Sequence, residues 1–159
     1  MSTVERDPAP SELERQPSAQ PSPGAAPALH GISVLELGLL AIAAYHFVIA
    51  ALMIFAPDTF FSSIGPFGTQ NDHYLRDTAT FELAFGVSLL LAYRRPAWRT
   101  PVLFCVTLQF ALHALNHLAD IGAAHPHWIG PFDFASLALT TGALAWLTRE
   151  STRSPEVRR

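Results

Sequence analysis

The third apolar stretch of the chain, residues 101–121, carries the side chains most capable of chemistry. Its polar members are Gln109, His113, Asn116, His117 and Asp120, and they follow one another mostly at steps of three or four residues. That spacing places them on one face of a helix, and the opposite face is apolar. Two histidines four residues apart can bind one metal ion, and histidine next to carboxylate can also pass protons.

Other apolar stretches carry ionisable residues as well. His46 lies in the first stretch, and the second begins with His73, Arg76, Asp77 and Glu82. Ionisable side chains inside a bilayer are costly, so they normally face a bundle interior or a wet cavity. Their presence in apolar stretches therefore suggests a shared polar site.

Four stretches are long enough to span a hydrocarbon core of roughly 30 Å. They cover residues 32–56, 73–93, 101–121 and 129–147. Half of the chain is hydrophobic and 14% is charged, against about a quarter charged in ordinary soluble domains. We therefore predict an all-α fold, a four-helix transmembrane bundle at residues 32–148. The segment 59–72, with aromatic residues among Gly, Pro and Ser, is predicted to be an interfacial loop.

The ends of the chain differ from this core. Residues 1–31 are rich in Pro, Ser, Ala, Glu and Gln, a composition that predicts a disordered tail. The first apolar run begins only near Ile32, which does not fit a signal peptide. Residues 149–159 form a second polar, Arg-rich tail. The small net charge of −3 argues against a nucleic-acid partner.

The distribution of arginine predicts the orientation in the cytoplasmic membrane. The second-to-third connection and the C-terminal tail hold seven arginines: Arg94, Arg95, Arg99, Arg149, Arg153, Arg158 and Arg159. The third-to-fourth connection holds none. Arginine-rich segments stay on the cytoplasmic side, so both termini are predicted to be cytoplasmic and the protein to be multi-pass.

This orientation brings polar residues of three helices to a similar depth. His46, Glu82 and His113 each fall roughly 12–15 Å below the outer end of their helix, and we expect an outward-facing pocket. Glu82 points away from the stripe of His73 and Asp77, so it should meet a different neighbour. At the cytoplasmic side, Glu36 should either cap its own helix or meet Arg99 or Arg149.

Several chemistries fit such a pocket, and the sequence leaves them open. A metal site would use His113 and His117, completed by Asp120 or His73. A haem would need two axial histidines, for which His46 and His113 have suitable depth. A quinone or lipid-like ligand is a further alternative, for which the sequence contains no specific motif. Proton transfer could run along Glu82, His113, His117 and Asp120.

The polar groups could instead bond one another and hold the helices together, at roughly 0.6–2 kcal/mol for each contact. Cys105, within an apolar run, is expected to be a small core residue. Whether the chain is an enzyme stays open at this stage.

The segment NDHYLRDTATFELAFGVSLLLAYRRP, residues 71–96, resembles small four-helix membrane proteins of the DoxX-like family. Arg76 and Gly86 are the matching positions. The resemblance implies a small accessory membrane protein, with relatives that partner quinone-linked redox enzymes, and it implies no catalytic residue. We therefore expect an accessory or binding role beside a membrane partner or in a homo-oligomer, and the alternative is a metal- or haem-binding redox subunit.

Overall fold

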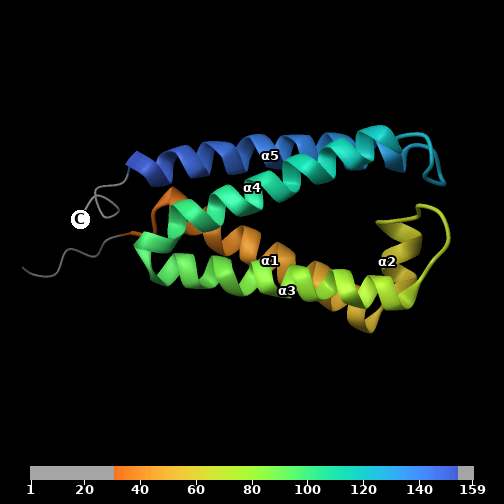
Figure 1. The fold of residues 1–159 in the computed structure, drawn as a ribbon, viewed down its shortest axis with the longest axis horizontal. Helices are drawn as coiled ribbons and strands as arrows, with labels where there is room; N and C mark the ends of the chain where they lie inside the picture. The colour runs from red at the N-terminus through yellow and green to blue at the C-terminus, as the bar shows by residue number, and fades with distance from the viewer. Residues whose placement is uncertain (1–30, 154–159) are drawn as a thin grey trace, which may run out of the picture. The chain divides into compact units, whose positions relative to one another are not determined.

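A computed structural model describes residues 31–153, so the predicted disordered tail lies almost wholly outside the described residues, as does the segment 154–159. The described part contains five helices and no strand (Figure 1). They are α1 (Val34–Phe55), α2 (Pro57–Ser63), α3 (Asp72–Arg94), α4 (Pro96–Ala119) and α5 (Ile129–Arg153). The predicted all-α fold class is confirmed.

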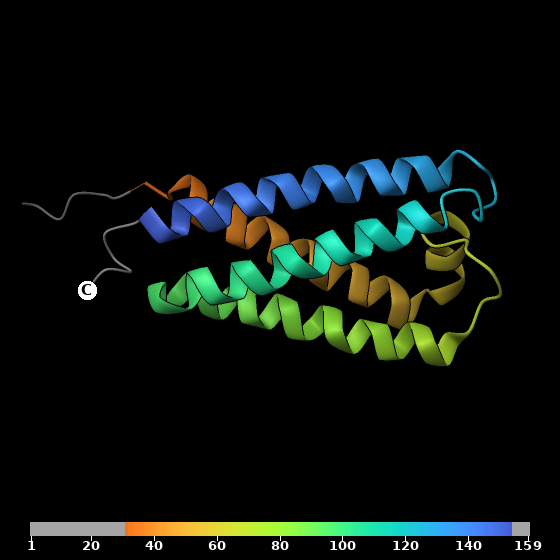
Figure 2. The ribbon, with the colours of Figure 1, turned by 45° about the horizontal axis from the view of Figure 1, so that its top comes forward.

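The four long helices associate as two pairs, α1 with α3 and α4 with α5 (Figures 1 and 2). The pairs meet most closely where α3 turns into α4 at Arg94–Pro96; we call this the closed end. Leu39, Leu89, Leu103 and Leu144, one from each long helix, are fully buried in one core there. Their burial from four helices at once holds the two pairs together.

At the other end, which α2 and the loop 120–128 occupy, the packing differs; we call this the cavity end. A second core forms there from Ala50, Met53, Phe60 and Ala79, which belong to α1, α2 and α3. Neither α4 nor α5 contributes a buried residue to it. The two pairs therefore have separate packing at this end, which leaves room for a cavity between them.

The segment predicted as an interfacial loop contains α2, and that prediction is corrected in part. Pro57 occupies the first helical position, where the missing N–H costs nothing, and Asp58 follows in the first turn. Phe60 turns inward and is buried against α1 and α3. Tertiary burial of Phe60 stabilises a helix too short to be expected from the sequence.

Two helix boundaries also differ from the prediction. α4 begins at Pro96, so that Pro101 lies inside the helix instead of starting it. α5 continues to Arg153, into the segment assigned to the C-terminal tail. Both differences have one cause. Apolar composition marks only the hydrophobic middle of a helix, whereas the helical backbone hydrogen bonds continue into its polar end turns.

Polar contacts fix the helix starts and the closed end. Ser33 and Glu36 form a capping box at the start of α1, which satisfies backbone N–H groups that have no partner within the helix. The same Glu36 carboxylate accepts a hydrogen bond of 3.0 Å from Arg99 of α4. Both roles expected for Glu36 are thus present together.

Two helices, α1 and α4, are long and apolar enough to cross a membrane. The other two long helices carry more polar residues, which at the cavity end include Asp77 and Glu82 in α3 and Asp133 in α5. All four long helices nevertheless expose large apolar side chains, which include Val48, Val87, Leu115 and Leu139.

Candidate functional site

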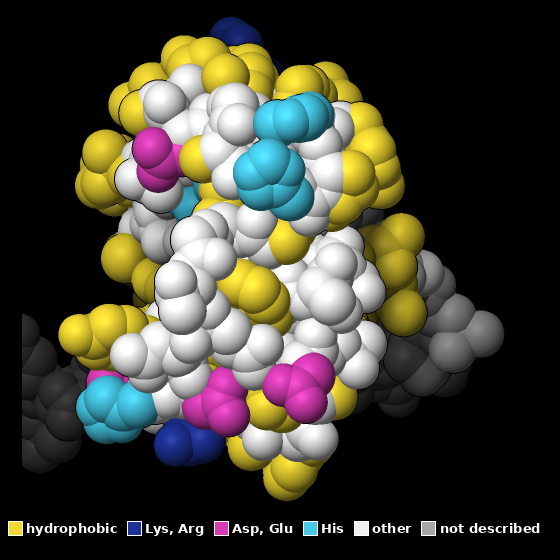
Figure 3. All heavy atoms as spheres, turned by 90° about the vertical axis from the view of Figure 1, so that its right-hand side faces the viewer, with side chains coloured by type: hydrophobic (Ala, Val, Ile, Leu, Met, Phe, Trp, Pro, Cys, Tyr) yellow, Lys and Arg dark blue, Asp and Glu magenta, His cyan; other side chains and the backbone are white. Residues whose placement is uncertain are grey.

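A cavity of about 590 Å³ lies between the two helix pairs at the cavity end. All five helices contribute to its wall. The polar lining residues are Tyr45, Thr78, Glu82, Gln109, His113, His117, Asp133 and Ser136, and aromatic rings cover much of the remainder. Figure 3 looks onto this end, where carboxylate and histidine side chains are spread over the face and hydrophobic side chains flank it. The cavity thus has an apolar wall with a minority of polar groups, which is typical of small-molecule sites.

Glu82 is held at the wall by a histidine behind it. Its Oε2 lies 2.6 Å from Nδ1 of His46, and both residues are buried. The His46 ring has no exposed surface and is packed among Tyr45, Phe85 and Phe110, with ring centroids 5.5, 5.5 and 5.8 Å away. This contact joins α1 to α3 and confirms that Glu82 meets a neighbour outside the stripe of its own helix.

The facing wall carries two histidines and a carboxylate. Nε2 of His113 lies 3.0 Å from Nε2 of His117, one turn along α4. Nδ1 of His117 lies 3.9 Å from Oδ2 of Asp133 on α5, which is too long for a hydrogen bond. Phe67, from the loop after α2, packs edge-on against the His117 ring at 4.8 Å.

That loop also ties the two helix pairs together at the cavity end. The backbone of Phe67 forms an isolated bridge with Ala124 in the loop 120–128. Phe67 therefore contacts both the backbone of the facing loop and the His117 side chain. It lines the cavity beside His117.

Several buried polar atoms of the wall have no hydrogen-bond partner within residues 31–153: Gln109 Oε1, His117 Nδ1 and Asp133 Oδ2. Buried polar atoms are nearly always satisfied in folded proteins, because an unpaired one costs about 1–3 kcal/mol. Three such atoms on one cavity wall are the pattern expected where a bound molecule or ordered water supplies the missing partners.

The structure gathers only part of the predicted site. Glu82, His113 and His117 line the cavity, and His46 lies directly behind Glu82. Gln109, from the same stripe of α4, lines it too. The apolar face opposite this stripe points outward, since Leu108, Leu115 and Leu118 are exposed.

The remaining predicted residues lie outside the cavity lining. His73 and Asp77 are exposed at the start of α3, where Nε2 of His73 lies 3.4 Å from Oδ2 of Asp77. Arg76, also in these first turns, is exposed as well. Asn116 is exposed on α4, and Asp120 is exposed at its C-terminal cap. His73, Arg76 and Asp77 lie in the first turns of α3 and Asp120 caps α4, so these residues are at the outer ends of their helices.

Tyr45 and Asp133 were not among the predicted pocket residues. Asp133 is an isolated carboxylate near the start of an apolar stretch, and that position was a usable signal for an intramembrane polar site. Tyr45 had no such signal, because a tyrosine in an apolar helix is ordinary. Its place on the wall, with its ring centroid 5.9 Å from that of Phe110 on α4, is given only by the tertiary structure.

The arrangement offers limited support for a metal or haem. In the part of the chain that the structure describes, no group of three or more His, Cys, Asp or Glu side chains could hold a metal ion. The predicted set of His113, His117 and Asp120 is therefore without structural support beyond its two histidines. The bis-histidine haem hypothesis also gains none, because His46 is fully buried among aromatic rings and is not among the residues that line the cavity.

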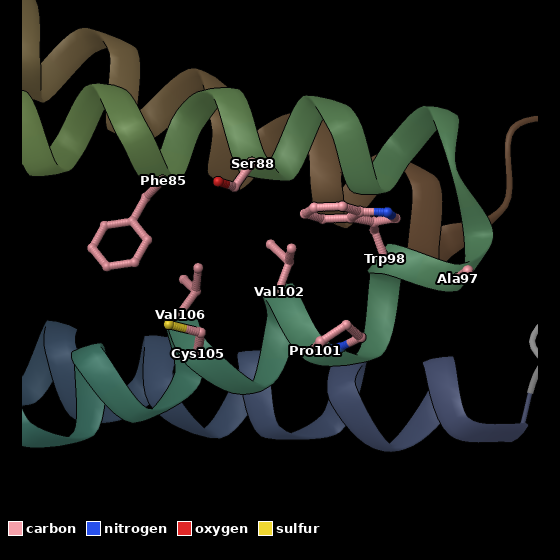
Figure 4. Close-up of a pocket in the computed structure, with 8 residues that line it drawn as sticks. All are labelled: Phe85, Ser88, Ala97, Trp98, Pro101, Val102, Cys105 and Val106. Carbon is pink, nitrogen blue, oxygen red and sulfur yellow. The ribbon is translucent and has the colours of Figure 1, made fainter.

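A second cavity, of about 430 Å³, lies between α3 and α4 nearer the closed end (Figure 4). Its lining includes Phe85, Trp98 and Val102, and no ionisable group except Cys105 is among its lining residues. Cys105 is exposed in this groove, so the expectation of a core cysteine is wrong. The apolar stretch around it faces outward as well as inward, and composition alone does not separate the two faces.

Comparison of the chain with protein-family models, with curated proteins and with solved structures finds no match. The resemblance to DoxX-like proteins therefore stays a prediction. Gly86, one of its two matching positions, is buried and lies against the Phe47 ring, where an added Cβ would come within 3.0 Å of ring carbons. This close packing of α1 on α3 explains a glycine there without reference to any family.

Proposed function

We propose that this chain is a four-span protein of the cytoplasmic membrane that binds a small amphipathic molecule in the cavity between its helix pairs. The exposed apolar side chains on all four long helices support membrane insertion, because so many would be unfavourable in water. The polar residues of α3 and α5 do not oppose it. Glu82 and Asp133 point to the cavity, and others lie in the terminal turns.

The distribution of charge supports an orientation with the closed end in the cytoplasm. Arg94, Arg95, Arg99, Arg149 and Arg153 all belong to helix ends at the closed end. At the cavity end the described charged residues are mostly carboxylates, with Arg76 the exception. The positive-inside rule then directs the cavity end outward.

The observation that carries the binding function is the cavity wall itself. It combines aromatic and aliphatic side chains with polar atoms that have no partner among the described residues. Its volume lies within the range of roughly 300–1,000 Å³ typical of ligand sites. Packing alone would favour closing such a space, because an empty cavity costs stability.

An accessory role beside a membrane partner, or in a homo-oligomer, is compatible with ligand binding and extends the DoxX-like resemblance. The alternative, a metal- or haem-binding redox subunit, predicts a chromophore or a stoichiometric metal in the purified protein. An absorbance spectrum and a metal analysis of one detergent preparation separate the two functions.

The proposed function is tested by filling the cavity with a large side chain and measuring whether the bound molecule is lost. Ser136 lines the cavity, whereas Leu139, three residues along α5, is exposed to the outside. Native mass spectrometry of protein extracted from membranes in mild detergent should show a bound small molecule in the wild type and in Leu139→Trp. Ser136→Trp should lack it. Identical spectra for all three proteins, or no bound mass in any of them, would contradict the proposal.

A further inference from the structure

The cavity of the proposed function has an unusual balance of charge. Every basic residue of the chain is an arginine, and no arginine is among the lining residues. The wall does contain two carboxylates, Glu82 from α3 and Asp133 from α5. They reach the cavity from opposite helix pairs, because α3 packs with α1 and α5 packs with α4. The wall therefore carries a carboxylate on each side and no guanidinium.

Glu82 is oriented so that one oxygen stays available. His46 engages Oε2 at 2.6 Å from behind, and Oε1 has no hydrogen bond to any residue of the described segment. This contact engages one of the two carboxylate oxygens, and Glu82 is among the residues that line the cavity. Glu82 therefore presents a hydrogen-bond acceptor to whatever occupies the space.

The facing wall also presents acceptors without a partner. The acceptor atoms Asp133 Oδ2 and Gln109 Oε1 are buried and have no partner in residues 31–153. Nδ1 of His117 lies 3.9 Å from Asp133 Oδ2. His117 and His113 share one N–H in their own contact at 3.0 Å, which reduces what they can donate elsewhere. A ligand with acceptors alone, such as a quinone, would leave these carboxylate and amide oxygens unsatisfied.

The apolar part of the wall suits a cation better than a neutral donor. Aromatic rings of Tyr45, Phe60, Phe67, Phe110 and Phe132 line the cavity. An ammonium group is attracted to the faces of such rings, and the attraction grows when water is excluded. Carboxylates and aromatic rings together thus provide both charge and surface for one kind of ligand.

We propose that the cavity binds an amphipathic organic cation, an ammonium group on an alkyl or aryl-alkyl body. The ammonium would lie between Glu82 and Asp133 and donate hydrogen bonds to their free oxygens and to Gln109. The apolar body would lie against the aromatic side chains. This inference rests on the proposed function, since it names the class of ligand for the same cavity.

The test uses three probes of nearly equal size that differ in charge: 4-phenylbutylammonium, 4-phenylbutanol and 4-phenylbutyrate. Binding is measured by calorimetry on the full chain in phosphatidylcholine nanodiscs, with empty nanodiscs to subtract partitioning into lipid. We expect the ammonium to bind about tenfold or more tightly than the alcohol, and the carboxylate not to bind measurably.

Asp133→Asn should reduce ammonium binding about tenfold and leave alcohol binding unchanged. The substitution removes no hydrogen bond, because Asp133 Oδ2 accepts none from the described chain, so the fold should persist. Asp77→Asn, the same change on an exposed residue of α3 outside the lining, is the matched control and should bind as the wild type does.

Three outcomes would each overturn the inference: equal affinity for the alcohol and the ammonium, no binding of the ammonium, or ammonium binding to Asp133→Asn that equals binding to the wild type. If one of these outcomes occurs while Ser136→Trp still abolishes binding of the alcohol or the carboxylate, the ligand-binding function survives and the cationic ligand does not. If Ser136→Trp changes the binding of none of the probes and native mass spectrometry shows no bound molecule, the ligand-binding function fails too.

Discussion

The closed end and the cavity end of this bundle use similar polar residues in different ways. At the closed end, Arg99 is 5% exposed, bonds Glu36 at 3.0 Å and donates to the carbonyl of Tyr93. Thr100 and Ser151 bond each other at 2.9 Å across α4 and α5. At the cavity end, Gln109 and Asp133 have buried oxygens without a partner in the described chain.

The difference separates two roles that the sequence does not distinguish. Satisfied polar contacts hold helices together and need nothing further. Unsatisfied ones leave hydrogen-bonding capacity that a ligand can use, at some expense of stability. Glu82 combines the two roles. Its contact with His46 joins α1 to α3, and its side chain also lines the cavity.

The strongest test of the comparison concerns which end faces outward. In a Cys105→Ala background, Thr59→Cys places a thiol in α2 at the cavity end, and Thr152→Cys places one in the last turn of α5 at the closed end. Both positions are exposed. A membrane-impermeant maleimide should label Thr59→Cys on intact cells and should label Thr152→Cys only after lysis. The reverse pattern, or equal labelling of both, would refute the proposed orientation.

The next largest effect is expected at the contact between His46 and Glu82. Glu82→Ala leaves the His46 ring without its partner in a fully buried place, and the unfolding free energy should fall by about 3 kcal/mol. The double variant His46→Leu/Glu82→Met replaces both groups by apolar ones and should recover most of that loss. The measurement is unfolding in mixed detergent micelles. A double variant as unstable as the single one would show that the pair is not acting as a unit.

Removing an unsatisfied polar group at the cavity end is expected to change the unfolding free energy in the opposite direction. Gln109→Leu removes a buried oxygen without a partner, so the unfolding free energy should stay level or rise by up to about 1 kcal/mol. Binding of 4-phenylbutylammonium should weaken in the same variant. A clear loss of stability would mean that Gln109 has a structural role like the polar residues of the closed end.

The smallest effect is expected for a satisfied pair between α4 and α5. The Thr107 and Thr148 hydroxyls lie 3.0 Å apart, and each also lies within hydrogen-bond distance of a carbonyl of its own helix. One hydroxyl therefore donates to the other, which in turn donates to its own helix. Thr107→Val with Thr148→Val should lower the unfolding free energy by about 0.6 kcal/mol and leave ligand binding unchanged. If the double substitution alters binding instead, the separation of the two ends is not valid.

The sequence alone predicted the four long helices, because sustained apolarity is a local property. It also predicted which face of α4 points into the bundle, because the polar stripe on that face follows directly from helical periodicity. The depth argument brought His46, Glu82 and His113 to one region, which matches their places on and behind the cavity wall.

Tertiary packing decided what periodicity does not contain. The contact of His46 with Glu82 depends on how α1 crosses α3, and the cavity depends on α2 packing with α1 and α3 but not with α4 and α5. Such crossings result from the shapes of many side chains at once. The residues available for chemistry were therefore determined by the sequence, whereas which of them are bonded and which face an open space was decided only when the helices packed.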